Sequence, residues 1–167
     1  MKRTGIAGIV GLILVAGAVF APPAAADDGG ITPDPQIAEM LAAVPGGIAV
    51  SEYRAVWPEL DMEMTVPQPA SRSASSTSSL AVTAAAVGTC ATGRVCAYSL
   101  NGMAGSQLSW SSCNTSFPVG SFEVRSIANA RSTGYMQARS RTATLATANA
   151  GQWKNVYGAT YRISCYT

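Results

Sequence analysis

The sequence predicts an all-β protein, a small Greek-key sandwich, preceded by a short α+β leader segment and a Ser/Ala-rich linker. Three observations lead to this fold class. Short apolar runs alternate with Gly, Asn, Ser and Pro over residues 88–167, which is typical of a β-sandwich. All four cysteines lie in the same stretch, as in small secreted domains held by disulfides. A Pro- and Ser-rich stretch separates it from an acidic segment that contains a short helical periodicity.

Residues 1–26 have the organisation of a secretory signal peptide. Lys2 and Arg3 form the charged region, residues 6–20 are apolar, and residues 24–26 are alanines suited to cleavage. The apolar run is shorter than the roughly 20 residues that a membrane span needs. We therefore expect a secreted, extracellular protein with no membrane span in the mature chain.

The charges of the mature chain are segregated along the sequence. Residues 27–69 contain eight acidic residues and one basic residue, Arg54, whereas residues 70–167 contain eight basic residues and one acid, Glu123. Such an asymmetry suggests two units, one of which docks on the other. Two solvated surfaces that merely differ in charge explain it equally well.

The acidic N-terminal segment, residues 27–69, predicts a helix followed by short strands. Asp34 can cap the helix with Pro35 at its first position, and Pro-Gly-Gly at residues 45–47 ends it. Between these signals, four apolar residues recur at helical spacing: Ile37, Met40, Leu41 and Val44. The predicted strands are residues 48–51, 54–57 and 62–66. About 40 residues are too few for an independent domain, so this segment is a candidate pro-region that assists folding or masks the basic unit.

A linker is predicted over residues 70–87, after Pro67 and Pro69. Residues 71–79 are Ser-rich and lack apolar periodicity, and Arg72 is a candidate site for proteolytic nicking. Residues 80–87 are rich in Ala and Val and suit either the end of the linker or a first strand.

The C-terminal unit, residues 88–167, predicts strands separated by turn signals. Asn101-Gly102 is a strong hairpin signal. We expect Trp110, Phe117 and Trp153 to lie in the core or line a groove. The predicted strands are residues 95–98, 107–110, 122–127, 135–138, 142–146 and 161–165.

The four cysteines, Cys90, Cys96, Cys113 and Cys165, permit three disulfide pairings. We favour Cys90–Cys96 with Cys113–Cys165, because the first pair is local and the second ties the later chain to the first hairpin. A disulfide that closes a loop of about 50 residues stabilises a fold by a few kcal/mol. A metal site is the weaker interpretation, since the chain has no histidine and the cysteines are not in paired CxxC form.

The residue inventory predicts that the protein is not an enzyme and needs no cofactor. Without histidine there is no Ser-His-Asp or Cys-His pair and no zinc-histidine site. Glu123 is the only carboxylate of residues 88–167, so two-carboxylate glycosidase chemistry cannot be built there. Calcium is also not expected, because Ca²⁺ prefers several oxygen ligands, few acids are available in these residues, and Arg125 would repel a cation.

Three residues carry the signature of a particular hairpin. Counting from Tyr98, Met103 falls at the fifth position and Gly105 at the seventh, a spacing that resembles the βγ-crystallin Greek-key hairpin, whose glycine accepts positive φ. The stretch CATGRVCAYSLNGMAG (residues 90–105) and the stretch RSIAN (125–129) closely resemble the family of secreted βγ-crystallin-like peptidase inhibitors, the Streptomyces metalloproteinase inhibitor family. The resemblance covers residues 88–167. It implies a βγ-crystallin-like sandwich that blocks an extracellular metalloprotease or serine protease through an exposed loop.

The sequence departs from that family at the loop offered to the protease. In the family's characterised inhibitor, a second short disulfide holds this loop, whereas residues 131–164 contain no cysteine and the corresponding stretch, residues 137–150, is Ala/Thr-rich and shorter. The remaining stapled loop therefore supplies the candidate inhibitory residues Gly93, Arg94 and Val95, with the Arg94–Val95 bond offered to the protease. Alternatively, this loop only anchors the first hairpin.

A second function class uses the basic residues instead. A non-inhibitory binding or toxin-like module would act on anionic cell-envelope polymers or membranes. If Arg139 and Arg141 lie on one strand, they share a face. Nucleic acid is not expected as a partner of an exported, disulfide-bonded domain. The basic residues available for this function are Arg125, Arg131, Arg139, Arg141, Lys154 and Arg162.

Overall fold

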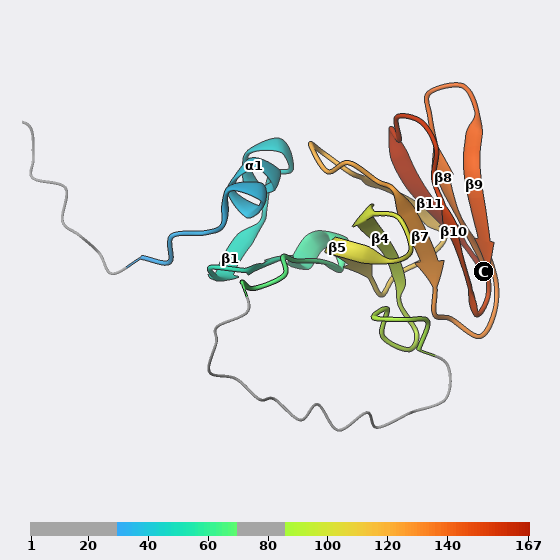
Figure 1. Cartoon of the computed structure of the whole chain (residues 1–167), viewed down its shortest axis with the longest axis horizontal. Coiled ribbons are helices and arrows are strands. Elements are labelled where there is room, and N and C mark those ends of the chain that lie inside the picture. Colours follow the sequence, from blue (N-terminus) through green and yellow to red (C-terminus); the bar gives the residue numbers. More distant parts are fainter. Residues whose placement is uncertain (1–29, 70–85) are drawn as a thin grey trace, which may run out of the picture. The chain divides into compact units, whose positions relative to one another are not determined.

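A computed structural model describes residues 30–69 and 86–167, and residues 31–167 belong to one compact unit. The predicted signal peptide (1–26) and residues 70–85 of the predicted linker lie outside the described residues. The predicted all-β class is confirmed: the described chain contains eleven strands in two antiparallel sheets, one α-helix and one 3-10 turn (Figure 1).

The larger sheet has seven strands and combines both halves of the chain. Its order is β1-β2-β3-β5-β4-β7-β10. The strands are β1 (Ile48–Ser51), β2 (Arg54–Trp57), β3 (Met62–Thr65), β4 (Val95–Leu100), β5 (Ala104–Trp110), β7 (Ser126–Asn129) and β10 (Gln152–Asn155).

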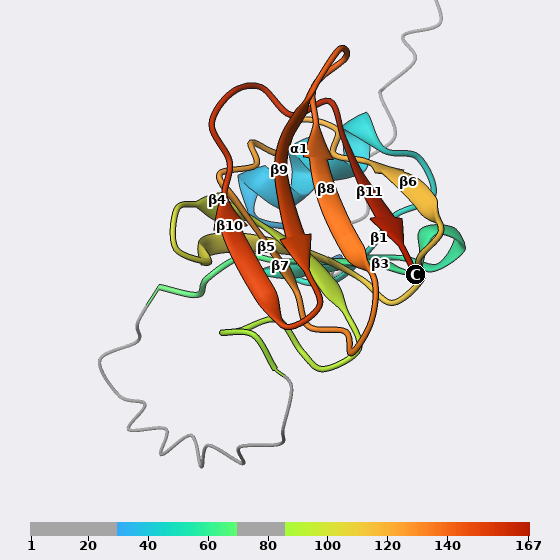
Figure 2. The same ribbon diagram turned by 90° about the vertical axis from the view of Figure 1, so that its right-hand side faces the viewer.

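The smaller sheet has four strands, in the order β6-β11-β8-β9, and packs on the larger one (Figure 2). Val95 and Ile127 of the larger sheet share one core cluster with Phe117, Met136 and Ile163 of the smaller sheet. The strands are β6 (Thr115–Pro118), β8 (Tyr135–Arg139), β9 (Thr144–Asn149) and β11 (Arg162–Tyr166).

The acidic segment is part of the same sheet and the same core. β3 pairs with β5 in antiparallel register from Met62 opposite Trp110 to Thr65 opposite Gln107. The helix α1 (Pro35–Ala43) begins where predicted, after Asp34, whose side chain accepts a hydrogen bond from the Gln36 amide. Its apolar face buries Ile37 and Met40 in the shared core. The segment therefore reaches stability by packing on the rest of the chain, which explains how so few residues become ordered.

Trp57 fixes the helix against the strands. Its side chain is 1% exposed, and its indole Nε1 donates a 2.8 Å hydrogen bond to the carbonyl of Val44, at the C-terminal end of α1. The 3-10 turn η1 (Pro58–Leu60) then leads from β2 into β3. A buried tryptophan contributes a large buried apolar area, and the hydrogen bond of its N–H fixes the orientation of the ring.

Several predicted strands differ in their bounds from those observed; β5, for example, begins at Ala104 and not at residue 107. Residues 122–127 were expected to be one strand, but β7 begins only at Ser126, because residues 119–125 form an irregular connection that alternates buried and exposed residues. The expected strand 142–146 is instead β9, which starts at Thr144. Trp110 and Phe117 are buried and stack at 5.0 Å between ring centroids, whereas Trp153 is 41% exposed on the edge strand β10.

Both favoured disulfides are present. Cys90–Cys96 has a Cα–Cα distance of 5.8 Å and lies in a small second core cluster with Tyr98 and Ala128. Cys113–Cys165 links the residues before β6 to β11. Each sheet therefore carries one covalent crosslink, through Cys96 of β4 in the larger sheet and Cys165 of β11 in the smaller one.

The Asn101-Gly102 turn connects β4 and β5 as predicted. Gly105 has φ +77°, and a Cβ at this position would lie 2.9 Å from Cγ of Leu100, so both the backbone and the space require glycine. Tyr98 is 1% exposed and packs with Met103 in the second core cluster. The three residues of the sequence signature thus have a common structural role in this hairpin.

Candidate functional site

The stapled loop between Cys90 and Cys96 does not present the bond expected to meet a protease. Val95 is 0% exposed and already belongs to β4, between Trp110 on one side and Asn129 on the other. The Arg94 carbonyl accepts a 2.9 Å hydrogen bond from the amide of Ala130. A protease must surround the bond it cleaves, and the Arg94–Val95 bond lies within a sheet. This geometry counts against the inhibitory role expected for Gly93, Arg94 and Val95.

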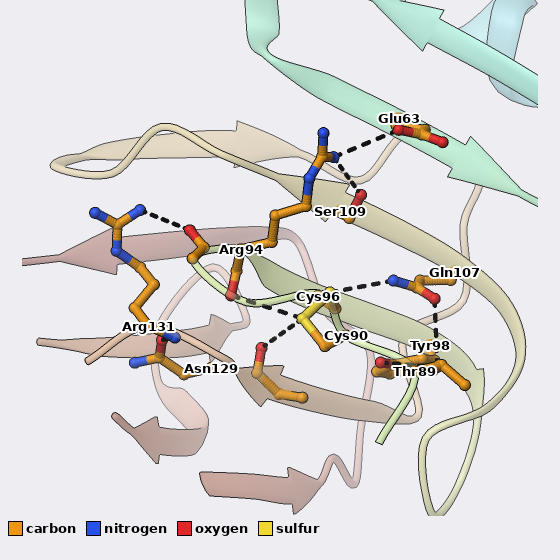
Figure 3. Close-up of a disulfide and its surroundings, with 12 residues drawn as sticks. Glu63, Thr89, Cys90, Arg94, Cys96, Tyr98, Gln107, Ser109, Asn129 and Arg131 are labelled. Carbon is orange, nitrogen blue, oxygen red and sulfur yellow. Dashed lines mark hydrogen bonds and ion pairs between the residues drawn. A yellow bond between two sulfur atoms is a disulfide. The ribbon is translucent and has the colours of Figure 1, made fainter. Parts of the chain in front are cut away.

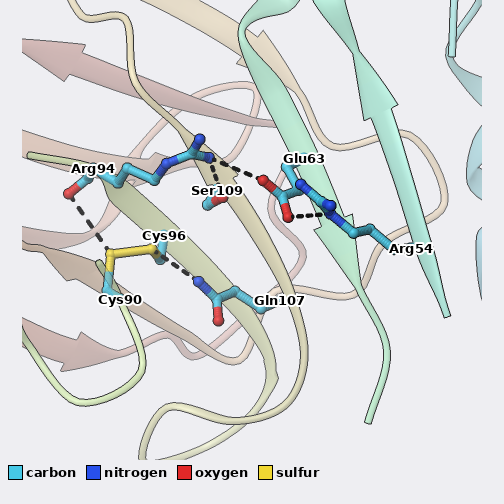
Figure 4. A network of polar contacts seen from close by, with 7 residues as sticks. All are labelled: Arg54, Glu63, Cys90, Arg94, Cys96, Gln107 and Ser109. Carbon is cyan, nitrogen blue, oxygen red and sulfur yellow. Dashed lines mark hydrogen bonds and ion pairs between the residues drawn. A yellow bond between two sulfur atoms is a disulfide. The ribbon is translucent and has the colours of Figure 1, made fainter. Parts of the chain in front are cut away.

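The Arg94 side chain points toward the acidic segment (Figure 4). Its Nη1 donates a 2.8 Å hydrogen bond to Oγ of Ser109 and lies 3.5 Å from Oε2 of Glu63. The other oxygen of Glu63 accepts a 2.6 Å hydrogen bond from Nε of Arg54, and this contact raises the pKa of Arg54. One carboxylate of β3 thus joins two arginines from opposite halves of the chain.

Arg131 anchors the same loop from the other side (Figure 3). Its Nη1 donates to the carbonyls of Gly93, at 3.1 Å, and Ser111, at 2.8 Å. The amide of Gly93 donates a 2.7 Å hydrogen bond to the Ala130 carbonyl. The loop is therefore held by its disulfide, by two strands and by an arginine, which supports the alternative that it anchors the first hairpin.

A different segment, residues 156–161, connects β10 to β11 and is fixed at both ends (Figure 2). Its first residue, Val156, is 0% exposed, and its amide donates a 2.8 Å hydrogen bond to the Arg125 carbonyl. At the other end, the amide of Tyr161 donates a 2.7 Å hydrogen bond to the Arg139 carbonyl. Both ends of the connection are therefore fixed to other elements.

The middle of this connection is exposed and its backbone is unpaired. Tyr157 is 71% exposed, and Gly158 and Ala159 are exposed beside it. Within the described ranges 30–69 and 86–167, no backbone hydrogen bond engages residues 157–160. Free backbone N–H and C=O groups in such a segment can pair with the edge of a partner's substrate-binding strands, as in β-strand addition.

An aromatic contact braces the base of the connection. The guanidinium of Arg141, in the β8–β9 turn, lies 4.3 Å from the ring centroid of Tyr161, a cation–π distance. The turn is itself compact, because the Ser140 amide donates a 2.9 Å hydrogen bond to the Ala143 carbonyl and Oγ of Ser140 accepts from the Ala143 amide at 2.9 Å. Non-covalent contacts thus hold this end of the molecule, which lacks the short disulfide of the resembled family.

This connection was not expected from the sequence, because no pair of cysteines marks it. The available signal was Tyr157-Gly158, an aromatic residue followed by glycine between two strands. Such a pair does not separate a buried turn from an exposed one. The exposure of Tyr157 becomes visible only when β10 and β11 are assigned to different sheets.

The remaining chemistry of the described residues is sparse. No group of three or more His, Cys, Asp or Glu side chains among them could hold a metal ion. Arg125, where a calcium site would need an oxygen ligand, forms an ion pair with Glu123. No helix in these ranges combines the length and apolar character needed to cross a membrane. No protein-family model, curated protein or solved structure matches the chain, so its function is inferred from the geometry of the described residues.

Proposed function

We propose that this protein is a secreted peptidase inhibitor that blocks an extracellular serine protease through residues 156–161. The observation that carries the proposal is the β10–β11 connection, whose ends are fixed by Val156 and Tyr161 and whose exposed middle presents Tyr157, 71% exposed. The resemblance of residues 90–105 and 125–129 to βγ-crystallin-like peptidase inhibitors supports the same function.

Tyr157 is the residue that enters the specificity pocket of the protease. Proteases with a hydrophobic slot accept a large apolar residue before the cleaved bond, which is Tyr157–Gly158 in this chain. A fixed loop binds tightly because little conformational freedom remains to be lost. Burial of Val156 and the hydrogen bond at Tyr161 hold both ends in place after cleavage, so the products do not separate.

A metalloprotease is the weaker target. Within residues 156–161, an enzyme that selects a large apolar residue after the cleaved bond would have to cut before Tyr157 or before Tyr161. The Tyr161 amide is held by the Arg139 carbonyl, and its ring lies against the guanidinium of Arg141. Val156 is fully buried and cannot enter a substrate cleft without local unfolding. The side-chain exposure therefore favours a serine protease of chymotrypsin or subtilisin specificity.

The finer fold assignment and the cellular location belong to the same proposal. A βγ-crystallin-like Greek-key arrangement is supported by the joint packing of Tyr98 and Met103 and by the glycine conformation at Gly105. Export is supported by residues 1–26 and by the two disulfides, which persist in oxidising compartments.

The test is a titration of the oxidised mature chain, residues 27–167, against chymotrypsin, a subtilisin, trypsin and a thermolysin-type enzyme. We expect stoichiometric inhibition of chymotrypsin or the subtilisin, with slow cleavage mapped by mass spectrometry to Tyr157–Gly158. Tyr157→Ala should weaken inhibition by about 100-fold or more, as expected for a residue that fills a pocket at the centre of an interface.

Tyr135→Ala is the matched control, since Tyr135 is also an exposed tyrosine, 40% exposed, but lies on β8. It should inhibit like the unmodified chain. The proposal fails if none of the four enzymes is inhibited at micromolar protein that remains intact, or if Tyr157→Ala inhibits as well as the control.

A further inference from the structure

The outer face of the four-stranded sheet is polar and carries positive charge. Phe117, Ala138 and Ile163 point into the core, so their neighbours along β6, β8 and β11 point away from it, because side chains alternate across a strand. This face is turned toward the viewer in Figure 2. We call it the outer face; its residues, one strand after another, are Ser116 and Pro118, Arg162, Ser164 and Tyr166, Tyr135, Gln137 and Arg139, and Thr147.

Two arginines of the outer face are placed directly opposite each other. Arg139 of β8 and Arg162 of β11 are register partners, and like charges in this position destabilise a sheet. Neither has an ion pair among the described residues, and residues 124–167 contain no Asp or Glu at all. Arg139 and Arg162 thus repel each other, and no acidic residue on β8 or β11 neutralises their charge.

The guanidinium of Arg139 is also poorly satisfied. Its Nε is buried without a hydrogen-bond partner among the described residues, and its Nη1 reaches only Oε1 of Gln137, at 3.5 Å. Next to Arg162, a cleft of about 390 Å³ is lined by the end of β6 and by Thr160, whose Oγ1 is likewise buried and unpartnered. Two polar groups at this end of the sheet, Nε of Arg139 and Oγ1 of Thr160, therefore have no hydrogen-bond partner among the described residues.

Three other arginines of this half of the chain are already engaged, and Lys154 lies on β10 in the larger sheet. Arg125 pairs with Glu123, Arg131 donates to two carbonyls, and Arg141 stacks on Tyr161. Arg141 lies beyond the end of β8, so the two residues expected to share a strand face, Arg139 and Arg141, do not do so. The residue that shares the face with Arg139 is Arg162.

A row of hydroxyl and amide groups continues across the sheet from the two arginines. Ser116, Ser164, Gln137 and Thr147 occupy successive strands in register. Oγ of Ser116 and Oγ of Ser164 are 2.8 Å apart, and Nε2 of Gln137 donates to Oγ1 of Thr147 at 3.3 Å. Ser164 is buried, so Ser116, Gln137 and Thr147 are the groups that can exchange hydrogen bonds with the hydroxyls of a ligand that lies flat on the sheet.

Beyond this row, Tyr135 and Tyr166 form the opposite end of the outer face. Their rings stack on each other at 4.9 Å between centroids. Stacking covers one face of each ring, so the pair offers hydroxyls and ring edges more than open platforms. Single-stranded nucleic acid is held mainly by bases that stack on aromatic faces, and this surface is poorly built for that mode.

We propose that the outer face binds an acidic polysaccharide. Carboxylates of the glycan pair with Arg139 and Arg162, because the planar guanidinium matches a carboxylate with two hydrogen bonds. The sugar hydroxyls pair with the row from Ser116 to Thr147. The inference does not depend on the proposed inhibitory function, since the residues that contact the glycan all lie outside residues 156–161.

The experiment is calorimetric titration of the mature chain with polygalacturonate at low salt, with dextran as the uncharged polysaccharide. Binding of polygalacturonate, weakened by added salt, and no binding of dextran are expected. Arg139→Gln combined with Arg162→Gln should weaken the affinity by about 10-fold or more, the scale of losing charge-assisted hydrogen bonds.

The matched control is Arg125→Gln combined with Lys154→Gln, which removes the same charge from two exposed positions outside the outer face. It should retain the affinity within about twofold, since these residues lie off the proposed contact. The Arg139/Arg162 variant should unfold at the same temperature as the unmodified chain or a higher one, because it relieves the repulsion. A loss of binding at unchanged stability therefore separates a binding role from a folding defect.

Four outcomes would overturn the proposal. They are no detectable binding of polygalacturonate, equal loss in the control variant, equal binding of dextran, and tighter binding of oligodeoxythymidylate or inorganic polyphosphate than of polygalacturonate. In each case, inhibition of a protease by the same preparation remains a separate measurement, so failure here and failure of the inhibitor proposal are distinguishable.

Discussion

Single residues in this protein are used for more than one connection, and Arg94 is the clearest case. Its backbone closes the stapled loop against Ala130, and its side chain reaches Ser109 and Glu63. The sequence shows only an arginine between two cysteines, which suggests an exposed reactive residue. The partners that bind it come from β3, from β5 and from the residue that follows β7, all distant in the chain, so no local pattern could reveal them.

Glycine positions with similar backbone angles should differ in their tolerance of a side chain. Gly105 and Gly93 have φ of +77° and +79°, but a Cβ at Gly105 would meet Leu100, whereas a Cβ at Gly93 meets nothing within 4 Å. Gly93→Ala should cost about 1 kcal/mol of unfolding free energy from backbone strain alone. Gly105→Ala should cost about 2–4 kcal/mol, because it adds overpacking to the strain. Urea unfolding of both variants measures this, and equal losses would contradict it.

Tyr98 should make the stability depend on alkaline pH. Burial raises its pKa above the ordinary value, and a hydrogen bond with Thr89 opposes this in part. The folded chain therefore holds the phenolic proton more tightly than the unfolded chain, for which the pKa is about 10. Stability is complete below that pH and falls as the pH rises through the folded-state pKa. Thermal unfolding between about pH 8 and pH 11 should show this fall, and Tyr98→Phe should reduce it; identical pH profiles would refute the assignment.

At the scale of elements, the predictable parts are those with a local cause. Helix α1 was expected because Asp34 and Pro35 start it and apolar residues recur at helical spacing. The strands β6 and β10 were not expected, because they are four residues long and mostly exposed, so they lack a two-residue apolar alternation. The pairing of β3 with β5 was also beyond reach, since a register between distant strands follows from core packing rather than from local signals.

The candidate site could not be predicted from the sequence, for the same reason. Two cysteines six positions apart are a strong local signal for a stapled loop. In the structure, however, this loop anchors the first hairpin. The connection at residues 156–161 has only a weak signal in the sequence. Its exposure depends on the placement of β10 and β11 in two different sheets.

For the whole molecule, the acidic segment is a structural part of the fold. It supplies Ile37, Met40, Trp57, Met62 and Met64 to the shared core. The candidate pro-region can be tested by expressing residues 86–167 alone. We expect this fragment to aggregate or to lose cooperative unfolding, because removal of β3 exposes Trp110 and the edge of β5.

The complementary measurement is to cleave the oxidised full chain once within residues 70–85 and to pass it over a gel-filtration column. The two fragments should elute together and separate only in denaturant. An independent, cooperatively folded 86–167 fragment with an unchanged unfolding temperature would show that the acidic segment is dispensable.

The antiparallel contact between β3 and β5 has a consequence for a cleaved molecule. In the continuous chain, the two strands belong to one molecule, so their contact is intramolecular. Cleavage converts the same contact into association between two separate polypeptides, which obeys mass action. Stability would then rise with the protein concentration. After such a cut, the two fragments would stay associated at high protein concentration. On dilution, the acidic segment would dissociate and expose the edge of β5.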